Sequence, residues 1–219
     1  MLTIEGLTVK IQNLTILRDI SITVPNGKII SLVGRNGAGK TTTIRSVLGL
    51  IKASSGSIKL DEIDLCATPV HKRVIQGISY MPEDRRIIPT ITVEENILLP
   101  AWAGKFEDTK KRLAEVYEQL PEVKEMARRT GAQLSGGQQK LVALARAMFA
   151  SRTLMLLDEP FEGVAPALVD RMWGTIRDYQ KEMPILVSTS EYGQVEEWAD
   201  EAYVIERGEI TGVRGGEIK

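Results

Sequence analysis

A glycine-rich segment, GRNGAGKT at residues 34–41, has residue types and spacing suited to holding phosphate groups. It fits the pattern G-x-x-x-x-G-K-[ST], with an apolar run before it and a helical pattern after it. Glycines let successive backbone N–H groups face an anion, and the start of the helix adds its positive dipole. Lys40 would reach the β- and γ-phosphates of a nucleotide, Thr41 would offer its hydroxyl to Mg²⁺, and Thr42 would donate to the α-phosphate. An ordinary glycine-rich turn is the alternative, and the complete pattern disfavours it. The predicted nucleotide contacts in this segment are Gly34, Arg35, Asn36, Gly37, Ala38, Gly39, Lys40, Thr41 and Thr42.

Two carboxylates end a second apolar run, LMLLDEP at residues 154–160. Asp158 falls at the carboxyl end of a predicted strand, where α/β sheets place ligand-binding groups, so we expect it to hold Mg²⁺ through water. Glu159 is then the candidate general base for a water molecule attacking the γ-phosphate. Such a pair alone is more often a solvated turn. The glycine-rich segment upstream favours the catalytic interpretation.

A third segment, LSGGQ at residues 134–138, precedes a helix with an apolar face. Ser135 can cap that helix, and Gly136 and Gly137 leave N–H groups uncovered at its start. A simple helix cap is one interpretation, and a second anion site is the other. A second anion site in a chain that already carries a phosphate-binding pattern is the interpretation we favour.

The elements that must position these residues alternate between short β-rich runs and helical stretches, which predicts an α/β fold. Residues 2–9 and 15–24 read as antiparallel strands, and residues 28–33 form a buried strand that enters the glycine-rich segment. Residues 93–150 are charged and helical in period, so we expect a helical subdomain inserted into the α/β core. Further strands are expected at 55–65, 77–81, 154–158, 184–189 and 202–206.

Composition restricts the kind of partner. With 28 Lys+Arg and 29 Asp+Glu in 219 residues, the net charge of -1 gives no basic field for a nucleic acid, so none is expected as a partner. The single Cys66 cannot form an internal disulfide, and the N-terminus lacks a secretory pattern, which favours the cytoplasm. No apolar run reaches the roughly 18 residues of a membrane span, so membrane association is expected only through a partner. We expect the three tryptophans to pack against the core: Trp102, Trp173 and Trp198.

In their order and spacing, the three segments resemble the ATP-binding cassette family of ABC transporters, across essentially the whole chain. GRNGAGKT resembles its Walker A motif, LSGGQ its signature, and LMLLDEP its Walker B motif with Glu159 as the catalytic glutamate. The resemblance implies one domain over 1–219: a P-loop NTPase core with a mixed sheet and flanking helices, an antiparallel β subdomain, and the helical subdomain at about 93–150. It implies ATP and Mg²⁺ as cofactors, and a head-to-tail dimer in which each ATP lies between one Walker A and the other signature. The signature contacts carried over are Ser135, Gly136, Gly137 and Gln138.

Several positions depart from the family pattern. Ser190 in the run ILVSTS stands where the family has a switch histidine. Its hydroxyl would contact phosphate or water weakly, or simply cap the strand end, and both interpretations stay open. Glu83 in YMPEDRR replaces the usual glutamine, and we expect it to be a metal ligand with Thr41 and Asp158. Ala165 and Ile11 replace an aspartate and the aromatic residue that stacks on adenine.

The segments PEDRR, TVEEN and EGVAP, with the non-histidine switch, resemble the shorter ATPase subunit of branched-chain amino acid importers. That subfamily carries glutamine at the switch, so Ser190 departs from it as well. The resemblance implies an ATPase that couples hydrolysis to solute transport through transmembrane permease subunits. A second cassette would complete a hetero- or homodimer, and the chain would lie peripherally on the cytoplasmic face of the cell membrane. Two alternatives remain: the ATPase subunit of an exporter, and a nucleotide-gated binding protein with low turnover.

Overall fold

The computed structural model describes residues 1–104, 106–180, 183–191, 193 and 195–215, and its strands form two sheets. A four-stranded antiparallel sheet has the order β2-β1-β4-β5, and a six-stranded sheet has the order β10-β9-β3-β8-β7-β6. The strands are β1 (Leu2–Ile11), β2 (Leu14–Val24), β3 (Ile29–Val33), β4 (Ser55–Leu60), β5 (Ile63–Asp64), β6 (Ile78–Met81), β7 (Leu154–Asp158), β8 (Ile185–Thr189), β9 (Glu201–Glu206) and β10 (Glu209–Gly215). The helices are α1 (Lys40–Val47), α2 (Val70–Ile75), α3 (Val93–Ala103), α4 (Thr109–Gln119), α5 (Pro121–Glu125), the 3₁₀ turn η1 (Gly131–Gln133), α6 (Gly136–Ala150), α7 (Pro166–Gln180) and α8 (Val195–Trp198).

The six-stranded sheet is mixed. Strands β9, β3, β8, β7 and β6 run parallel, and β10 pairs antiparallel with β9. Since the carboxyl ends of parallel strands meet at one edge, the segments that leave β3, β6, β7 and β8 gather there. That edge positions the glycine-rich segment, the Glu83 loop, the acidic pair and Ser190.

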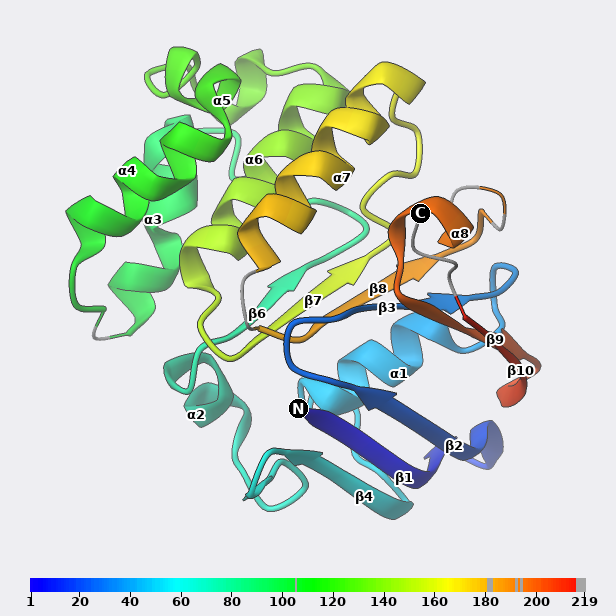
Figure 1. Ribbon diagram of the computed structural model, residues 1–219. Helices are drawn as coiled ribbons and strands as arrows, with labels where there is room; N and C mark the ends of the chain where they lie inside the picture. Colours follow the sequence, from blue (N-terminus) through cyan, green and yellow to red (C-terminus); the bar gives the residue numbers. More distant parts are fainter. Residues whose placement is uncertain (105, 181–182, 192, 194, 216–219) are drawn as a thin grey trace.

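The parallel strands are buried on both faces, which explains their continuous apolar runs. In β7, Leu154 and Leu156 pack with α1 and the antiparallel sheet, whereas Met155 and Leu157 pack with the helices on the opposite face. Figure 1 shows this layering, with α6 and α7 over one face of the sheet and α1 between the other face and β1, β2 and β4. The alternation follows from side chains that point to opposite faces along a strand.

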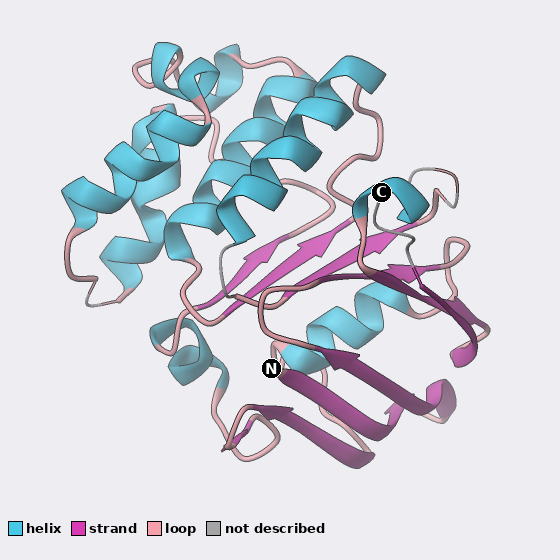
Figure 2. Ribbon diagram, viewed as in Figure 1, coloured by secondary structure: helices cyan, strands magenta, loops and turns pink. Residues whose placement is uncertain are grey.

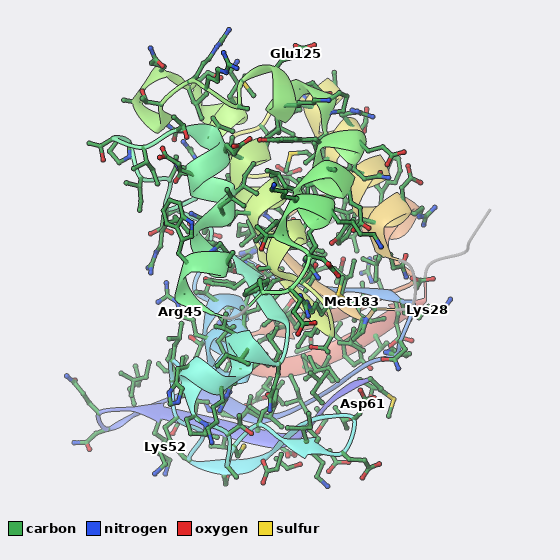
Figure 3. All side chains as sticks on the ribbon, turned by 90° about the vertical axis from the view of Figure 1, so that its left-hand side faces the viewer. Lys28, Arg45, Lys52, Asp61, Glu125 and Met183 are labelled. Carbon is green, nitrogen blue, oxygen red and sulfur yellow. The ribbon has the colours of Figure 1, made fainter. Side chains whose placement is uncertain are left out.

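The helices between residues 93 and 150 form one layer (Figure 2), in which α6 packs against β6 and α4 contacts α7. A capping box at Thr92 and Glu95 starts α3, and the buried Asn96 side chain donates to the Ile88 and Thr92 carbonyls, which ties the preceding loop to the helix. In Figure 3, Lys52 and Asp61 lie beside the antiparallel sheet, and Glu125 of α5 lies at the opposite end of the molecule. That this layer is a separate subdomain stays a prediction, and so does the single domain over residues 1–219. Residues 216–219 lie outside the described residues.

Apart from the one at 55–65, the expected strands are confirmed to within one or two residues, and the α/β architecture with a mixed and an antiparallel sheet is confirmed. The single strand expected at 55–65 is wrong, because a turn with Asp61 in the left-handed region (φ 49) divides it into β4 and β5. Strand β10 was missed. Trp102 is 61% exposed, which corrects the expectation for that residue, whereas Trp173 is buried and stacks on Trp198. Within the described part of the chain, no helix combines the length and apolarity needed to cross a membrane.

Candidate active site

The glycine-rich segment turns sharply between β3 and α1. Gly34 donates its N–H to the Thr189 carbonyl, and a Cβ there would clash with the carbonyl of Ile205. Gly39, the residue before α1, has φ 119, and a Cβ on it would lie 2.6 Å from the Leu17 side chain. Only glycine fits both positions, because one is crowded by backbone and the other needs a left-handed conformation. The sequence therefore folds here into a compact loop at the start of a helix.

Lys40 lies buried across this loop and is 5% exposed. Its ammonium donates to the Gly34 carbonyl at 2.6 Å and to the Arg35 carbonyl at 3.3 Å. It also forms an ion pair of 2.9 Å with Glu159 Oε1, whose side chain is 7% exposed. That contact lacks hydrogen-bond geometry, and Glu159 Oε1 has no hydrogen bond from a described group. The predicted phosphate-binding lysine and the predicted base thus face each other directly.

Asp158 is fully buried and receives three hydroxyl groups. Ser188 donates to Oδ1 at 2.6 Å, Thr41 donates to the same oxygen at 3.1 Å, and Tyr80 donates to Oδ2 at 3.2 Å. Burial first, and then the Asp158 charge, raise the pKa of Tyr80 to about 12, so the phenol stays a donor. The donors come from β8, α1 and β6, which fixes the carboxylate at the sheet edge.

Glu159 has an unusual backbone conformation, with φ 45 in the left-handed region. Its N–H is shared between the carbonyl and the hydroxyl of Ser188, both at 3.1 Å. Its Oε2 accepts from the Ser190 N–H at 3.1 Å and lies 3.4 Å from the Ser190 hydroxyl. Lys140 donates to its carbonyl at 2.7 Å. A strained conformation held by this many contacts is typical of a functional position.

A cavity of about 290 Å³ opens beside the loop. Its lining residues come from the loop, β2, the Glu83 segment and the acidic pair: Ile16, Asn36, Gly37, Gly39, Lys40, Thr41, Thr42, Glu83 and Glu159. Burial, followed by the charges of Glu162, Asp158 and Glu159, raises the pKa of Glu83. Arg35 and Ala38, also predicted contacts, line a second hollow with Arg18 and Arg207 instead.

The oxygen groups at this edge suit Mg²⁺. The Thr41 hydroxyl and Asp158 carboxylate are already 3.1 Å apart, and Glu83 lines the same cavity. Mg²⁺ prefers such hard oxygen ligands and commonly completes its shell with phosphate and water. Among the described residues no group of three or more His, Cys, Asp or Glu side chains forms a metal cage. The residues present fit a cation that arrives with a nucleotide.

The LSGGQ segment lies apart from this cavity, since none of its residues is among those that line it. Ser135 caps α6: its Oγ accepts from the Gln138 N–H at 3.3 Å, and the Gln138 side chain accepts from the Ser135 N–H at 2.9 Å. The helix-cap interpretation is therefore confirmed. The role of Ser135, Gly136, Gly137 and Gln138 as a second anion site stays a prediction.

Sequence reasoning missed four residues around the site, namely Ile16, Tyr80, Lys140 and Ser188. Tyr80 and Ser188 carry a signal, because each is polar within an apolar run that ends at the sheet edge. Ile16 lines the cavity, whereas Ile11, which stands in place of the family's aromatic residue, is 44% exposed and is not among the lining residues.

Comparison with known proteins identifies the family to which this geometry belongs. A family model described as ABC transporter matches residues 17–162. The chain belongs to the ABC transporter family. The high-affinity branched-chain amino acid transport ATP-binding protein BraG of Pseudomonas aeruginosa is 32% identical over 212 residues, which are 96% of this chain and 91% of that protein. The lipopolysaccharide export system ATP-binding protein LptB of Haemophilus influenzae is 32% identical over 213 residues, 96% of this chain and 88% of that protein.

Among solved structures, one described as the ATP-binding subunit of an ABC transporter aligns with a TM-score of 0.87 and 25% identity, covering 98% of this chain and 90% of that one. The expected P-loop NTPase fold is confirmed. This ABC cassette binds ATP and is an ATPase, as the sequence predicted. It is an ATP-binding subunit of a transport system.

Proposed function

We propose that this cassette is the ATPase subunit of a branched-chain amino acid importer, working with transmembrane permease subunits on the cytoplasmic face of the membrane. The likeness to BraG and the PEDRR, TVEEN and EGVAP segments support import. The equal identity of the LptB relative makes an exporter of a lipid or polysaccharide the second candidate.

One observation supports the catalytic part of the proposal most strongly: Lys40, Asp158 and Glu159 converge on one sheet edge beside the glycine-rich loop. We assign Lys40 to the β- and γ-phosphates and the loop N–H groups with Thr42 to the remaining phosphate oxygens. Thr41, Asp158 and Glu83 would hold Mg²⁺, which neutralises charge on the phosphates during phosphoryl transfer to water.

Glu159 is assigned as the base that orients and deprotonates the attacking water. Its present partner is Lys40, so ATP binding requires the Lys40 ammonium to exchange that carboxylate for phosphate oxygens. The exchange leaves the Glu159 carboxylate free for water while Ser190 still contacts Oε2. Ser190 then positions the base from the side opposite Lys40, in place of a direct contact to phosphate.

The separation of LSGGQ from the cavity supports a dimer in which a second cassette supplies that segment. The start of α6, with Gly136 and Gly137 at its first turn, offers uncovered N–H groups that suit a γ-phosphate. Each subunit would then hold half of each ATP site. ATP would close the dimer, and hydrolysis would reopen it.

The test is to purify the tagged chain with its native membrane partners and reconstitute the complex in vesicles. Leucine with its binding protein should stimulate ATP hydrolysis, and the Glu159→Gln complex should show no stimulation. Stimulation by a lipid or polysaccharide instead would support the exporter. Hydrolysis that responds to no solute, at a rate far below the roughly 1 s⁻¹ at the low end of ordinary enzyme turnover, would support the nucleotide-gated binding protein.

A further inference from the structure

The Lys140 side chain is buried, and no carboxylate of a described residue forms an ion pair with its ammonium. Lys140 lies in the second turn of α6 and is 2% exposed. Its ammonium donates to two backbone carbonyls, those of Glu159 at 2.7 Å and Glu83 at 3.1 Å. Burying an ammonium is costly unless its hydrogen bonds are well made, so these two contacts determine where the side chain can lie.

The two carbonyls belong to the loops that leave β6 and β7 at the site edge. One loop carries the assigned metal ligand and the other carries the assigned base. Lys140 itself follows the signature cap, Ser135, by five residues on the same helix. A single side chain therefore connects the start of α6 to both loops that face the cavity.

The contact to Glu159 acts on a strained peptide. Glu159 has φ 45, and its carbonyl carbon is bonded directly to the Cα that carries the assigned base, so a shift of this peptide moves the side chain. Lys140 holds that carbonyl from the α6 side, while Ser188 holds the N–H from β8. Backbone held in a sparsely populated conformation relaxes when such a contact is removed.

We propose that Lys140 is a positioning residue for ATP hydrolysis, which fixes the Glu159 and Glu83 loops relative to the signature end of α6. This inference rests on the proposed function, because it acts through the role assigned to Glu159. It predicts that loss of the ammonium displaces the base without removing any group that touches the nucleotide.

The experiment compares Lys140→Met with wild type in the complex with its membrane partners. We expect kcat to fall about 10- to 100-fold, the range for a misplaced catalytic group, with the KM for ATP within about 3-fold of wild type. Lys140→Arg keeps a charged donor and should recover part of the lost kcat. Val142→Ala is the matched control: Val142 is a fully buried residue of the same helix with an apolar side chain, and its truncation should lower the Tm while kcat stays unchanged.

A double variant separates positioning from general destabilisation. Because Lys140 acts through Glu159, Lys140→Met in a Glu159→Gln background should lower single-turnover hydrolysis by less than about 2-fold further. If the rate loss of the double variant equals the product of the two single-variant losses, the inference is overturned. A wild-type kcat in Lys140→Met would overturn it as well. If Lys140→Met does not fold, Lys140→Gln, which retains a donor without charge, is measured against the same criteria. Wild-type turnover in Glu159→Gln alone would instead overturn the role proposed for Glu159, so the two failures are distinguishable.

Discussion

The ion pair between Lys40 and Glu159 makes a quantitative prediction for Glu159→Gln. At a separation of 2.9 Å, an effective dielectric constant of roughly 20 gives a gross attraction of about 6 kcal/mol. Desolvation of two nearly buried charges offsets much of this, and removing one partner of a buried pair costs about 3–5 kcal/mol. Lys40 keeps its bonds to the Gly34 and Arg35 carbonyls, and the glutamine amide oxygen can still accept. We therefore expect a net loss of about 1–3 kcal/mol in the nucleotide-free chain.

Thermal unfolding measures the loss of stability in the nucleotide-free variant, and nucleotide titration measures the accompanying change in its affinity for ATP. For a chain of this size the Tm of nucleotide-free Glu159→Gln should fall by about 2–12 °C. ATP restores a charge partner to Lys40, so the variant should bind ATP about 5- to 150-fold more tightly than wild type. Hydrolysis should slow by about 10²- to 10⁴-fold, because the base is removed.

Glu162→Gln is the matched control. It also removes a carboxylate from the loop after β7, but the Glu162 side chain is exposed. Its Tm and ATP affinity should stay close to those of wild type. The reasoning is refuted if nucleotide-free Glu159→Gln is as stable as wild type and binds ATP no more tightly, because the ion pair would then not compete with the nucleotide.

Three further substitutions test other contacts of the site. Lys40→Ala should weaken ATP binding at least about 100-fold, through the loss of charge-assisted contacts to phosphate, and an unchanged titration would remove Lys40 from the site. Ser188→Ala should lower the free energy of unfolding by about 1–3 kcal/mol, since it leaves buried Asp158 and the Glu159 N–H short of a partner; an unchanged Tm would contradict this. Ser190→Ala removes only the long hydroxyl contact to the Glu159 carboxylate, 3.4 Å, and should lower turnover of the assembled complex by a factor that corresponds to about 0.5–1.5 kcal/mol. Ser190→His should raise turnover or leave it unchanged. A loss in Ser190→Ala as complete as that of Glu159→Gln would make Ser190 a primary catalytic group.

The positions of the strands along the sequence and the glycine-rich loop could be predicted, because both are visible as local patterns. A continuous apolar run followed by glycines is visible in residues 28–39, and the acidic pair follows the same kind of run. The neighbours of these segments depend on strand order, which no local pattern specifies. Asp158 and Ser188 are 30 residues apart and meet only because β7 and β8 are adjacent.

Lys140, on a helix, is a second residue whose neighbours do not follow from the local sequence pattern. Its position between Gln139 and Leu141 reads as a polar residue at the start of an apolar helix face, and that pattern favours solvent. Packing of α6 against the sheet instead buries it against the loops that leave β6 and β7. Trp102 shows the opposite error, because a lone aromatic residue was expected in the core and its side chain is exposed.

A crystal structure of Glu159→Gln bound to ATP and Mg²⁺ tests the central claim most directly. The account predicts ATP in the cavity beside the glycine-rich loop, with the Lys40 ammonium on the β- and γ-phosphates and no longer on residue 159. It also predicts Ser135 and Gly137 of a second cassette at the γ-phosphate. ATP bound in the hollow lined by Arg18, Arg35 and Arg207, or Lys40 still paired with residue 159, would contradict it.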